Sequence, residues 1–379
     1  MKIKKKILIF TGSRADYGIL RTLIKKLNIK INISIVAGAD HYSKKFGLTY
    51  KEILNDGYNI NYRSKLKSYD NSQSLSIYCS KILEEYSNII LKKKFNGAIV
   101  LGDRYEAYIF SLSCFLNKVP IFHLHGGELT KGSIDDSMRH SISKFANFHF
   151  VTRNIYKRRL IQLGEVPEKI FMYGSLGNEN FNLIKNSSKK KIFSKYKIPF
   201  EKKLIIVTFH PETISNFSYK KQIDIFLGGL KNKKNYFYIF TSTNSDPGSK
   251  LFMRQINSYV NKNKNSKIVN SFGQEDYAAL LKKADLMVGN SSSGVIESPS
   301  ASIYSIIVGN RQDGRFLDKN IIKCSLNSSS ISTLIDKYIK KKINIKNGHQ
   351  KSSSLISKKI CQIIKKDKIN LIKKFYDIR

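Results

Sequence analysis

Short apolar runs alternate with helical patterns along the whole chain. Lys6–Thr11 (KILIFT) is an apolar run, and the apolar residues of Leu20–Leu27 then recur at i, i+3, i+4 and i+7, the spacing of an amphipathic helix. Ile33–Ala37 and Ala98–Leu101 are further apolar runs, and a second helical pattern at Tyr78–Ile90 separates them. Continuous apolar strands that alternate with helices predict a parallel sheet with both faces buried.

The alternation occurs in two halves, which predicts two domains for 379 residues. A Lys/Ser/Asn-rich stretch at Asn182–Lys197 separates the halves. The second half begins with the apolar run Leu204–Phe209 and repeats the pattern. Further strands are expected at Val119–His123, Phe148–Val151, Ile170–Tyr173, Tyr236–Phe240, Ile268–Val269, Leu286–Val288 and Ile303–Val308. We expect an N-terminal domain over residues 1–181 and a C-terminal domain over 182–353, with a C-terminal helix in residues 354–379 packing back on the first domain.

The formal net charge of +39 raises the question of a nucleic-acid or membrane partner. The lysines are spread along the whole chain, and no segment interleaves basic and aromatic residues as a single-strand-binding surface does. We therefore interpret the lysines as solvated surface that attracts anionic substrates, and we expect no nucleic-acid and no membrane partner.

Cysteines and apolar runs indicate the compartment. The four cysteines are far apart, with no C-x-x-C pair, which fits neither a zinc ribbon nor a disulfide framework. The N-terminal apolar run is too short for a signal peptide, and no later run approaches the length of a membrane span. We expect a cytoplasmic protein.

The densest chemistry lies in His123–His140 (HLHGGELTKGSIDDSMRH), directly after a predicted strand. Ligands of open parallel sheets bind beyond the carboxyl ends of the strands, so this stretch is the candidate active site. His123, His125 and Glu128 offer mixed nitrogen and oxygen ligands to a metal. Alternate residues of a strand point to opposite faces, however, so we expect no metal here.

A helix is expected after the Gly-Gly turn of this stretch. On it, Asp135 and Arg139 stand at i, i+4, and so do Asp136 and His140. Each pair could be a salt bridge at the start of the helix, so we expect one of the two acids to be structural.

Two other loops of the first half follow strands. Gly12–Asp16 could hold a phosphate through backbone N–H groups at a helix start, although it matches no known phosphate motif. Arg14 in it could pair with that phosphate or with Asp16. Asp103 and Arg104 follow the strand at Ala98–Leu101 and could orient a sugar hydroxyl, transfer a proton or form a plain ion pair.

The second half contributes an anion site. Gly289–Gly294 (GNSSSG) is the strongest phosphate cradle of the chain, with small residues and hydroxyls before an expected short helix that contains Glu297. Glu297 could accept the hydroxyls of a ribose, and Arg311 and Arg315 add positive charge. His210 follows a strand and could contact a phosphate, donate a proton or simply be packed. The alternative for the cradle is a flexible Ser-rich turn.

These motifs resemble the hydrolysing UDP-N-acetylglucosamine 2-epimerases of sialic acid biosynthesis. The matching stretches are TGSRADYG (Thr11–Gly18), GDRYE (Gly102–Glu106), HLHGGE (His123–Glu128), IDDSMRHSISK (Ile134–Lys144), RRLIQLGE (Arg158–Glu165), FHPET (Phe209–Thr213), GNSSSGVIE (Gly289–Glu297), GNRQDGR (Gly309–Arg315) and FYDI (Phe375–Ile378). They follow one another over nearly the whole chain. The resemblance implies an α/β fold of the GT-B type, with two Rossmann-like domains facing each other across a cleft that holds the nucleotide. It also implies a reaction without metal or cofactor, and we expect a homo-oligomer, a dimer or tetramer.

The resemblance assigns roles to individual residues. The nucleotide-binding positions of the family match Arg14, Arg104, His210, Asn244, Ser291, Ser292, Glu297 and Arg311, and its acidic active-site positions match Asp103, Glu128 and Asp135. We add His125 and His210 as candidate catalytic residues, and His123, Arg139, His140, Ser293 and Arg315 as candidate substrate-binding residues. Some family members carry a glutamate at the position of His125, so the proton-transfer roles of His125 and Glu128 stay open.

The implied reaction converts UDP-N-acetylglucosamine and water to N-acetylmannosamine and UDP. A carboxylate removes the C2 proton as UDP leaves C1, and water then adds to the resulting glycal while C2 is reprotonated on the other face. This requires two acid/base groups of different pKa and fixed positive charge at the leaving diphosphate. The alternatives are the same reaction on a UDP- or GDP-linked 2,4-diacetamido-2,4,6-trideoxyglucose, and a GT-B glycosyltransferase, which would need an acceptor.

Overall fold

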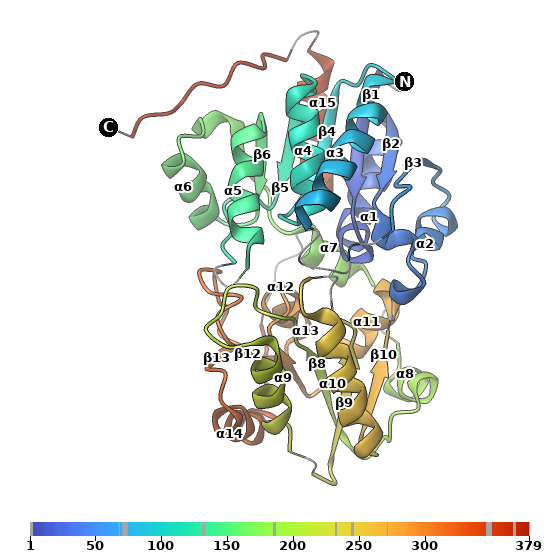
Figure 1. The fold of residues 1–379 in the computed structure, drawn as a ribbon, viewed down its shortest axis with the longest axis vertical. Helices are drawn as coiled ribbons and strands as arrows, with labels where there is room; N and C mark the ends of the chain where they lie inside the picture. The colour runs from blue at the N-terminus through green and yellow to red at the C-terminus, as the bar shows by residue number, and fades with distance from the viewer. Residues whose placement is uncertain are drawn as a thin grey trace. The chain divides into compact units, whose positions relative to one another are not determined.

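A computed structural model describes residues 3–67, 69, 75–130, 133–184, 187–231, 233–243, 246–270, 272–345, 351–366 and 369–378. The chain divides into two compact units (Figure 1). Unit 1 comprises Met1–Glu128, Asp135–Asn180 and Gln350–Arg379, and unit 2 comprises Leu129–Ile134 and Phe181–His349. The short segment Leu129–Ile134 thus groups with unit 2, whereas the sequence prediction placed it in the first domain.

Unit 1 contains a seven-stranded sheet in which all neighbouring strands are parallel. Its strands are β1 (Ile3–Thr11), β2 (Ile31–Ala37), β3 (Ile60–Arg63), β4 (Gly97–Leu101), β5 (Ile121–Leu124), β6 (Phe148–Val151) and β7 (Ile170–Met172), in the order β3-β2-β1-β4-β5-β6-β7. Its helices are α1 (Arg14–Asn28), α2 (Tyr50–Asn55), α3 (Leu75–Leu91), α4 (Tyr105–Leu116), α5 (Asp135–Phe145), α6 (Asn154–Gln162) and α15 (Ser352–Lys365), and α7 (Leu176–Leu183) leads into unit 2. Short 3-10 turns lie at Ala39–Tyr42, Lys44–Phe46 and Pro167–Lys169.

The sheet of unit 1 has apolar side chains on both faces because successive residues of a strand alternate in direction. Ile7 and Ile9 of β1 pack in one core with α1 and α15, whereas Leu8 and Phe10 pack in a second core with α3 and α4. The C-terminal helix therefore returns to unit 1, as predicted, through residues such as Ile360, which is 0% exposed.

Unit 2 repeats the architecture with six parallel strands. They are β8 (Lys203–Thr208), β9 (Tyr236–Thr241), β10 (Ser266–Val269), β11 (Leu286–Gly289), β12 (Tyr304–Val308) and β13 (Ile321–Cys324), in the order β10-β9-β8-β11-β12-β13. Its helices are α8 (Lys189–Tyr196), α9 (Tyr219–Gly228), α10 (Ser249–Lys262), α11 (Gly273–Leu281), α12 (Ser293–Ile296), α13 (Ser298–Ala301) and α14 (Ser328–Tyr338). Ile205 and Val207 of β8 pack with α9, α10 and α14, and Leu204 and Ile206 pack on the opposite face with α8 and α11.

Three features differ from the sequence prediction. The edge strands β3 and β13 were not predicted, because both are short and only half buried, so they lack a continuous apolar run. The polar stretch taken as a domain boundary contains helix α8. The C-terminal helix ends at Lys365, and residues 369–378 beyond it have no regular secondary structure.

Candidate active site

The predicted site residues follow neighbouring strands at the carboxyl edge of each sheet. In unit 1 the strand order reverses between β1 and β4, and in unit 2 it reverses between β8 and β11. Loops that follow such neighbouring strands diverge and leave room for a ligand. Gly12 and Asp103 lie in these loops of unit 1, and His210 and Ser291 lie in the corresponding loops of unit 2.

Arg139 lies at the centre of the acidic cluster of unit 1. Its side chain is 1% exposed; the guanidinium contacts the Asp103 carboxylate, donates to the carbonyl oxygen of His125 at 3.1 Å and lies 3.7 Å from Glu128 Oε2. Burial alone would lower the pKa of Arg139, but the negative charges of Asp103, Glu128 and Asp135 raise it. Arg139 is therefore a charged residue buried among the acids, and its predicted contact with substrate stays a prediction.

His125 and Glu128 form a buried pair. His125 Nδ1 lies 3.0 Å from Glu128 Oε1, and the hydroxyl of Thr152 donates to the same carboxylate oxygen at 3.4 Å. His125 has a φ of 66°, which lets the chain leave β5 and turn toward Glu128. Within the described residues, His125 Nε2 is buried and has no hydrogen-bond partner. An imidazole held by a carboxylate at one nitrogen can transfer a proton at the other.

The glycines after His125 are required by close packing. Gly127 has a φ of 74°, and a Cβ atom there would lie 2.4 Å from the carbonyl oxygen of Tyr156 in α6. Arg159 of the same helix donates to the carbonyl oxygen of Gly127 at 3.1 Å. The Gly-Gly turn is thus fixed against α6, and it sets the direction of Glu128.

His123 is bonded to the protein through both ring nitrogens. It is 0% exposed; its Nε2 donates to the carbonyl oxygen of Gly102 at 2.8 Å, and its Nδ1 pairs with Ser143 Oγ at 3.1 Å. Burial lowers the pKa of His123 to about 3, so the ring is neutral. These bonds position the loop that carries Asp103, and the predicted contact of His123 with substrate stays a prediction.

The loop Gly12–Asp16 uses backbone N–H groups inside the protein, in contrast to the predicted contact with a phosphate. Asp16 Oδ2 accepts hydrogen bonds from the backbone N–H groups of Gly12 (3.1 Å) and Ser13 (2.9 Å) and from Ser13 Oγ (3.1 Å). A carboxylate of the protein therefore occupies the donors that we expected a phosphate to use. Arg14 begins α1 and is half buried, with its charge close to Glu52.

Arg104 lies in an ion-pair cluster of unit 1. Its guanidinium donates to Asp40 and to Glu106, each at 3.0 Å. Burial raises the pKa of Glu106 to about 7, although the charge of Arg104 opposes this. His140 lies 3.7 Å from Asp136 on α5, the i, i+4 pair that the sequence offered as a structural alternative. The nucleotide contact of Arg104 stays a prediction.

In unit 2, Glu297 and Ser293 are linked through hydroxyl groups. Ser293 Oγ donates to Glu297 Oε2 at 2.5 Å, and Tyr277 OH lies 2.5 Å from the same Ser293 oxygen. Burial raises the pKa of Glu297 above its ordinary value, although the Ser293 bond opposes this. Helix α12 ends before Glu297, so this residue lies between two four-residue helices and not within one as expected.

The remaining predicted residues of unit 2 lie in loops after β8, β11 and β12. Arg311 is 7% exposed and lies 3.5 Å from Asp246, and Arg315 Nε donates to the carbonyl oxygen of Leu129 at 3.3 Å. His210 is 5% exposed. Ser291 and Ser292 are half buried. Asn244 lies outside the described residues.

Several residues around these loops were missed as candidate site residues. Asn290, Glu212 and Gln312 are buried polar residues of unit 2 that bond the loop backbones, and Tyr277 bonds Ser293. The sequence could have indicated Asn290, Glu212 and Gln312, because they belong to the motifs GNSSSG, FHPET and GNRQDGR. Their roles depend on which carbonyl and amide groups they face, and a single sequence does not contain that information.

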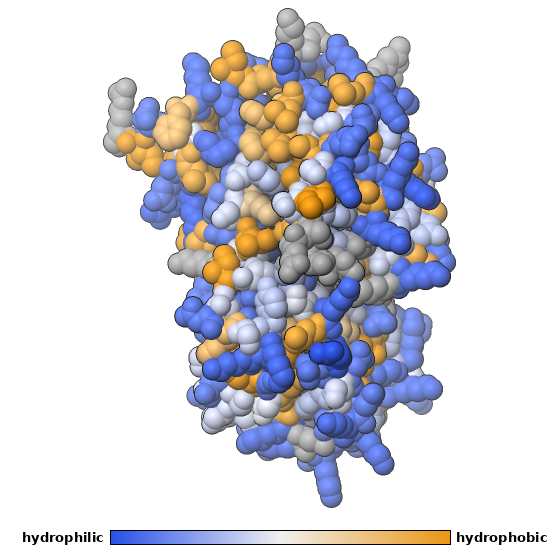
Figure 2. Space-filling model, viewed as in Figure 1, coloured by the Kyte–Doolittle hydropathy of each residue, from blue (hydrophilic) through white to orange (hydrophobic). Residues whose placement is uncertain are grey.

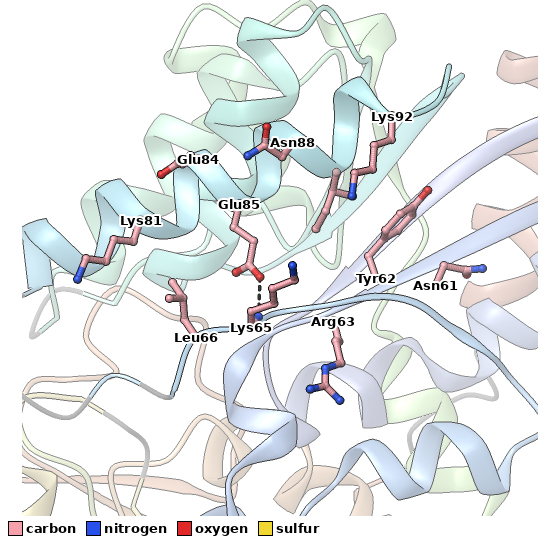
Figure 3. A pocket seen from close by; sticks show the side chains of 11 residues that line it. Asn61, Tyr62, Arg63, Lys65, Leu66, Lys81, Glu84, Glu85, Asn88 and Lys92 are labelled. Carbon is pink, nitrogen blue, oxygen red and sulfur yellow. Dashed lines mark hydrogen bonds between the residues drawn. The ribbon is translucent and has the colours of Figure 1, made fainter.

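A cavity of about 630 Å³ in unit 1 is separate from this chemistry (Figure 3). It lies between the β3 region and α3, and Glu85 in it accepts a hydrogen bond from the backbone of Lys65 at 2.5 Å. None of the predicted site residues lines it.

In the part of the chain that the structure describes, no group of three or more His, Cys, Asp or Glu residues is arranged to hold a metal ion. No described helix is both long enough and apolar enough to cross a bilayer.

The two parallel α/β units carry acids at the sheet edge of one and hydroxyls and arginines at that of the other, as expected of enzymes that act on nucleotide sugars. Residues 7–365 match the protein family described as UDP-N-acetylglucosamine 2-epimerase, and the chain belongs to this family.

Relatives and solved structures agree with this assignment. The chain is 37% identical over 327 residues, 86% of this chain and 85% of the relative, to a hydrolysing GDP/UDP-N,N'-diacetylbacillosamine 2-epimerase of Campylobacter jejuni. It is 33% identical to the polysialic acid biosynthesis protein P7 of Escherichia coli over 99% of this chain and 98% of that one. The structure of a UDP-N-acetylglucosamine 2-epimerase of Methanocaldococcus jannaschii with UDP-N-acetylglucosamine and UDP has a TM-score of 0.81 at 20% identity, covering 94% of this chain and 99% of that chain. The predicted fold class is confirmed.

Proposed function

We propose that the protein is a hydrolysing 2-epimerase that converts UDP-N-acetylglucosamine and water to UDP and N-acetylmannosamine for the synthesis of a sialic acid or a related sugar acid. The observation that carries the proposal is the cluster in unit 1, where Asp103, Glu128 and His125 contact the buried Arg139 and Asp135 lies one helical turn before it. Such a cluster supplies the two acid/base groups that epimerisation at C2 requires.

The chemistry begins with removal of the weakly acidic C2 proton by a carboxylate of this cluster. The C1–O bond to UDP breaks, and the electron pair of the C2–H bond forms the C1–C2 double bond of a glycal. Water then adds its oxygen to C1 and gives one of its protons to a basic group, while a second group gives a proton to C2 from the opposite face and the C1–C2 double bond becomes single. The pair of His125 and Glu128 is suited to one of these steps because Nε2 of His125 is left for a ligand.

Arg139 supports this chemistry by holding negative charge in a buried place. Bringing carboxylates together in a buried place is costly unless a cation is paired with them. Arg139 contacts Asp103 and lies 3.7 Å from Glu128, so it offsets this cost and fixes the direction of both side chains. The role of Arg139 is thus to hold the acids together and to direct them.

The leaving UDP requires fixed positive charge and hydrogen-bond donors. We propose that the diphosphate binds the loops of unit 2 that carry Ser291, Ser292 and Arg311, and that Glu297 binds the ribose hydroxyls. Arg311 is nearly buried, so its charge is screened less than that of a surface lysine. Donors placed where charge develops stabilise the departure of the leaving group.

A second substrate is favoured by the relative from Campylobacter jejuni, which is described as acting on GDP/UDP-N,N'-diacetylbacillosamine. The same proton transfers at C2 apply to a 2,4-diacetamido-2,4,6-trideoxy sugar, since the 4-substituent does not take part in the reaction. The two sugars differ only in the groups that a pocket must accommodate at C4 and C6.

The test is incubation of the protein with UDP-N-acetylglucosamine, and separately with UDP- and GDP-linked diacetamido sugars, without an acceptor. We expect release of UDP and of the free 2-epimer from UDP-N-acetylglucosamine at the highest kcat/KM. A higher kcat/KM for a diacetamido sugar would reassign the substrate within the same reaction. Release of nucleotide only when an acceptor sugar is added would instead indicate a glycosyltransferase.

A further inference from the structure

Three loops of unit 2 carry the proposed nucleotide contacts, and they follow three neighbouring strands. The strands β8, β11 and β12 are adjacent and parallel in the sheet, so their carboxyl ends lie side by side. His210 follows β8, Ser291 follows β11, and Arg311 follows β12. A buried polar side chain lies in each loop next to these residues, at Glu212, Asn290 and Gln312.

Asn290 joins the first two loops. It is 0% exposed; its Oδ1 accepts a hydrogen bond from the backbone N–H of His210 at 2.7 Å, and its Nδ2 donates to the carbonyl oxygen of His210 at 2.8 Å. The amide thus binds both backbone groups of His210, as a neighbouring strand would. This fixes the peptide planes on either side of the histidine.

Glu212 joins the first loop to the third. It is 4% exposed, and its Oε1 accepts hydrogen bonds from the backbone N–H groups of Asn310 at 2.7 Å and Arg311 at 3.0 Å. Gly309, with a φ of 80°, makes room for it, because a Cβ atom there would lie 2.3 Å from Glu212 Oε1. Burial raises the pKa of Glu212, whereas the two N–H groups and the charge of Arg311 oppose this rise.

Gln312 joins the third loop to the second. It is 2% exposed, and its Nε2 donates to the carbonyl oxygen of Asn290 at 2.9 Å. Gln222 of α9 fixes Glu212 in turn, since it accepts from the backbone N–H of Glu212 at 2.9 Å and donates to its carbonyl oxygen at 3.1 Å. Each of the three loops is therefore bonded to the other two by a buried side chain.

We propose that Glu212, Asn290 and Gln312 are positioning residues that hold these three loops in the conformation that binds the nucleotide diphosphate. The inference rests on the proposed function, because it takes the loops to be the nucleotide site. None of the three needs to touch the ligand. They act through the backbone of His210 and Arg311, whose side chains are directed by that backbone, and buried hydrogen bonds to a charged group are the strongest available for this purpose.

The experiment measures UDP affinity and local hydrogen exchange in the full-length protein. For Glu212→Gln we expect the Kd of UDP to rise about 10- to 100-fold, the loss expected for hydrogen bonds to a charged group. We expect faster exchange of the amides of Asn310 and Arg311, with exchange in unit 1 unchanged. The matched control is Glu275→Gln, an exposed glutamate at the start of α11 in the same unit, which should bind UDP like the wild type.

A second variant and a measurement on the wild type test the inference even if Glu212→Gln does not fold. Gln312→Met removes the bond to Asn290 but leaves both bonds of Glu212, and it should also weaken UDP binding. In the wild type, saturating UDP should slow exchange in residues 309–312. The positioning role would be wrong if the folded variants bound UDP with wild-type affinity. It would also be wrong if UDP bound the wild type without changing hydrogen exchange at 309–312. Neither result would overturn the proposed function. Failure of the wild type to bind UDP would overturn the proposed function.

Discussion

Arg139 is the buried cation that contacts the acids of the cluster, so its replacement tests the cluster as a whole. In Arg139→Met the buried carboxylates of Asp103 and Glu128 lose their cation. Breaking a buried ion pair on one side destabilises a protein by about 3–5 kcal/mol. We expect a lower free energy of unfolding in urea and, in the folded fraction, at least about a 100-fold loss of kcat, since a positioned general acid or base usually contributes that factor and the acids lose the cation that directs them.

The matched control is Arg158→Met, because Arg158 is exposed on α6 in the same unit. It should have near wild-type kcat and stability. If Arg139→Met kept wild-type kcat, the buried cation would not be needed to direct the acids, and the role assigned to it would be wrong.

The acids themselves are tested by isosteric replacement. Asp103→Asn, Glu128→Gln and Asp135→Asn should each lose turnover by about 100-fold or more, the usual contribution of a general acid or base. Each should still bind UDP with wild-type affinity in calorimetry, because the contacts proposed for the diphosphate and the ribose lie in unit 2 and none of the three acids is a proposed nucleotide contact. Near-normal rates in all three variants would refute the assignment.

At the residue scale, the sequence predicted which residues lie at a sheet edge, but it did not predict their hydrogen-bond partners. Asp103, Glu128 and His210 follow apolar strands, so their place at a sheet edge could be inferred from the sequence. The bonds of His123 to Ser143 and to the Gly102 carbonyl could not be predicted, because these partners lie about twenty positions away in sequence. Such bonds arise from how strands and helices pack, and local patterns do not encode them.

At the scale of elements, the segment after α15 is attached to unit 1 through Lys373, which contacts the buried Glu165. Lys373 Nζ donates to the carbonyl oxygens of Ser143 (3.0 Å) and Ala146 (2.6 Å) and lies 2.6 Å from Glu165 Oε2. The backbone N–H of Tyr376 donates to the carbonyl oxygen of Gly164 at 2.9 Å. Figure 1 shows this segment passing near α5 and α6. The motif FYDI at the end of the chain thus contributes to the packing of unit 1.

Glu165 gives this attachment a pH dependence. Burial alone would raise its pKa, but the hydrogen bond from His149 and the charge of Lys373 lower the pKa to about 2. The folded-state pKa is below the ordinary value of 4.5, so the stabilisation is complete above about pH 5 and is lost as the pH falls toward 2. Glu165→Gln should lower the free energy of unfolding at pH 7 by about 1–3 kcal/mol.

Urea titrations at several pH values measure this effect. The difference between wild type and Glu165→Gln should shrink steadily as the pH falls from about 5 toward 2. Glu168→Gln, an exposed glutamate three residues along, is the control and should match the wild type throughout. A difference that stayed constant with pH would show that ionisation of Glu165 does not stabilise the fold.

Strands buried on both faces were predictable, and so were the edge strands β7 and β10, whereas the edge strands β3 and β13 were not. β1, β4 and β8 read as continuous apolar runs because helices cover both sides of them. β3 alternates between half-buried and exposed residues, so its pattern resembles a loop. The grouping of Leu129–Ile134 with unit 2 depends on contacts such as that of Leu129 with Arg315, which are distant in sequence.

At the scale of the whole molecule, the net charge of +39 should increase the rate at which the protein captures an anionic substrate. On the face in Figure 2, hydrophilic side chains are spread over both units and do not form a single stripe. A dispersed positive field attracts an anionic nucleotide sugar and is screened by salt. We expect kcat/KM to fall several-fold between about 50 and 500 mM salt while kcat changes little. A kcat/KM that rose with salt would contradict this.

The central claim is that the acidic cluster of unit 1 removes and returns a proton at C2 of the sugar. The most direct measurement is turnover of UDP-N-acetylglucosamine in deuterated water without an acceptor, with the product analysed by NMR and mass spectrometry. We expect release of UDP and a 2-epimeric sugar that carries deuterium at C2. A 2-epimeric product with the original hydrogen at C2 would contradict it.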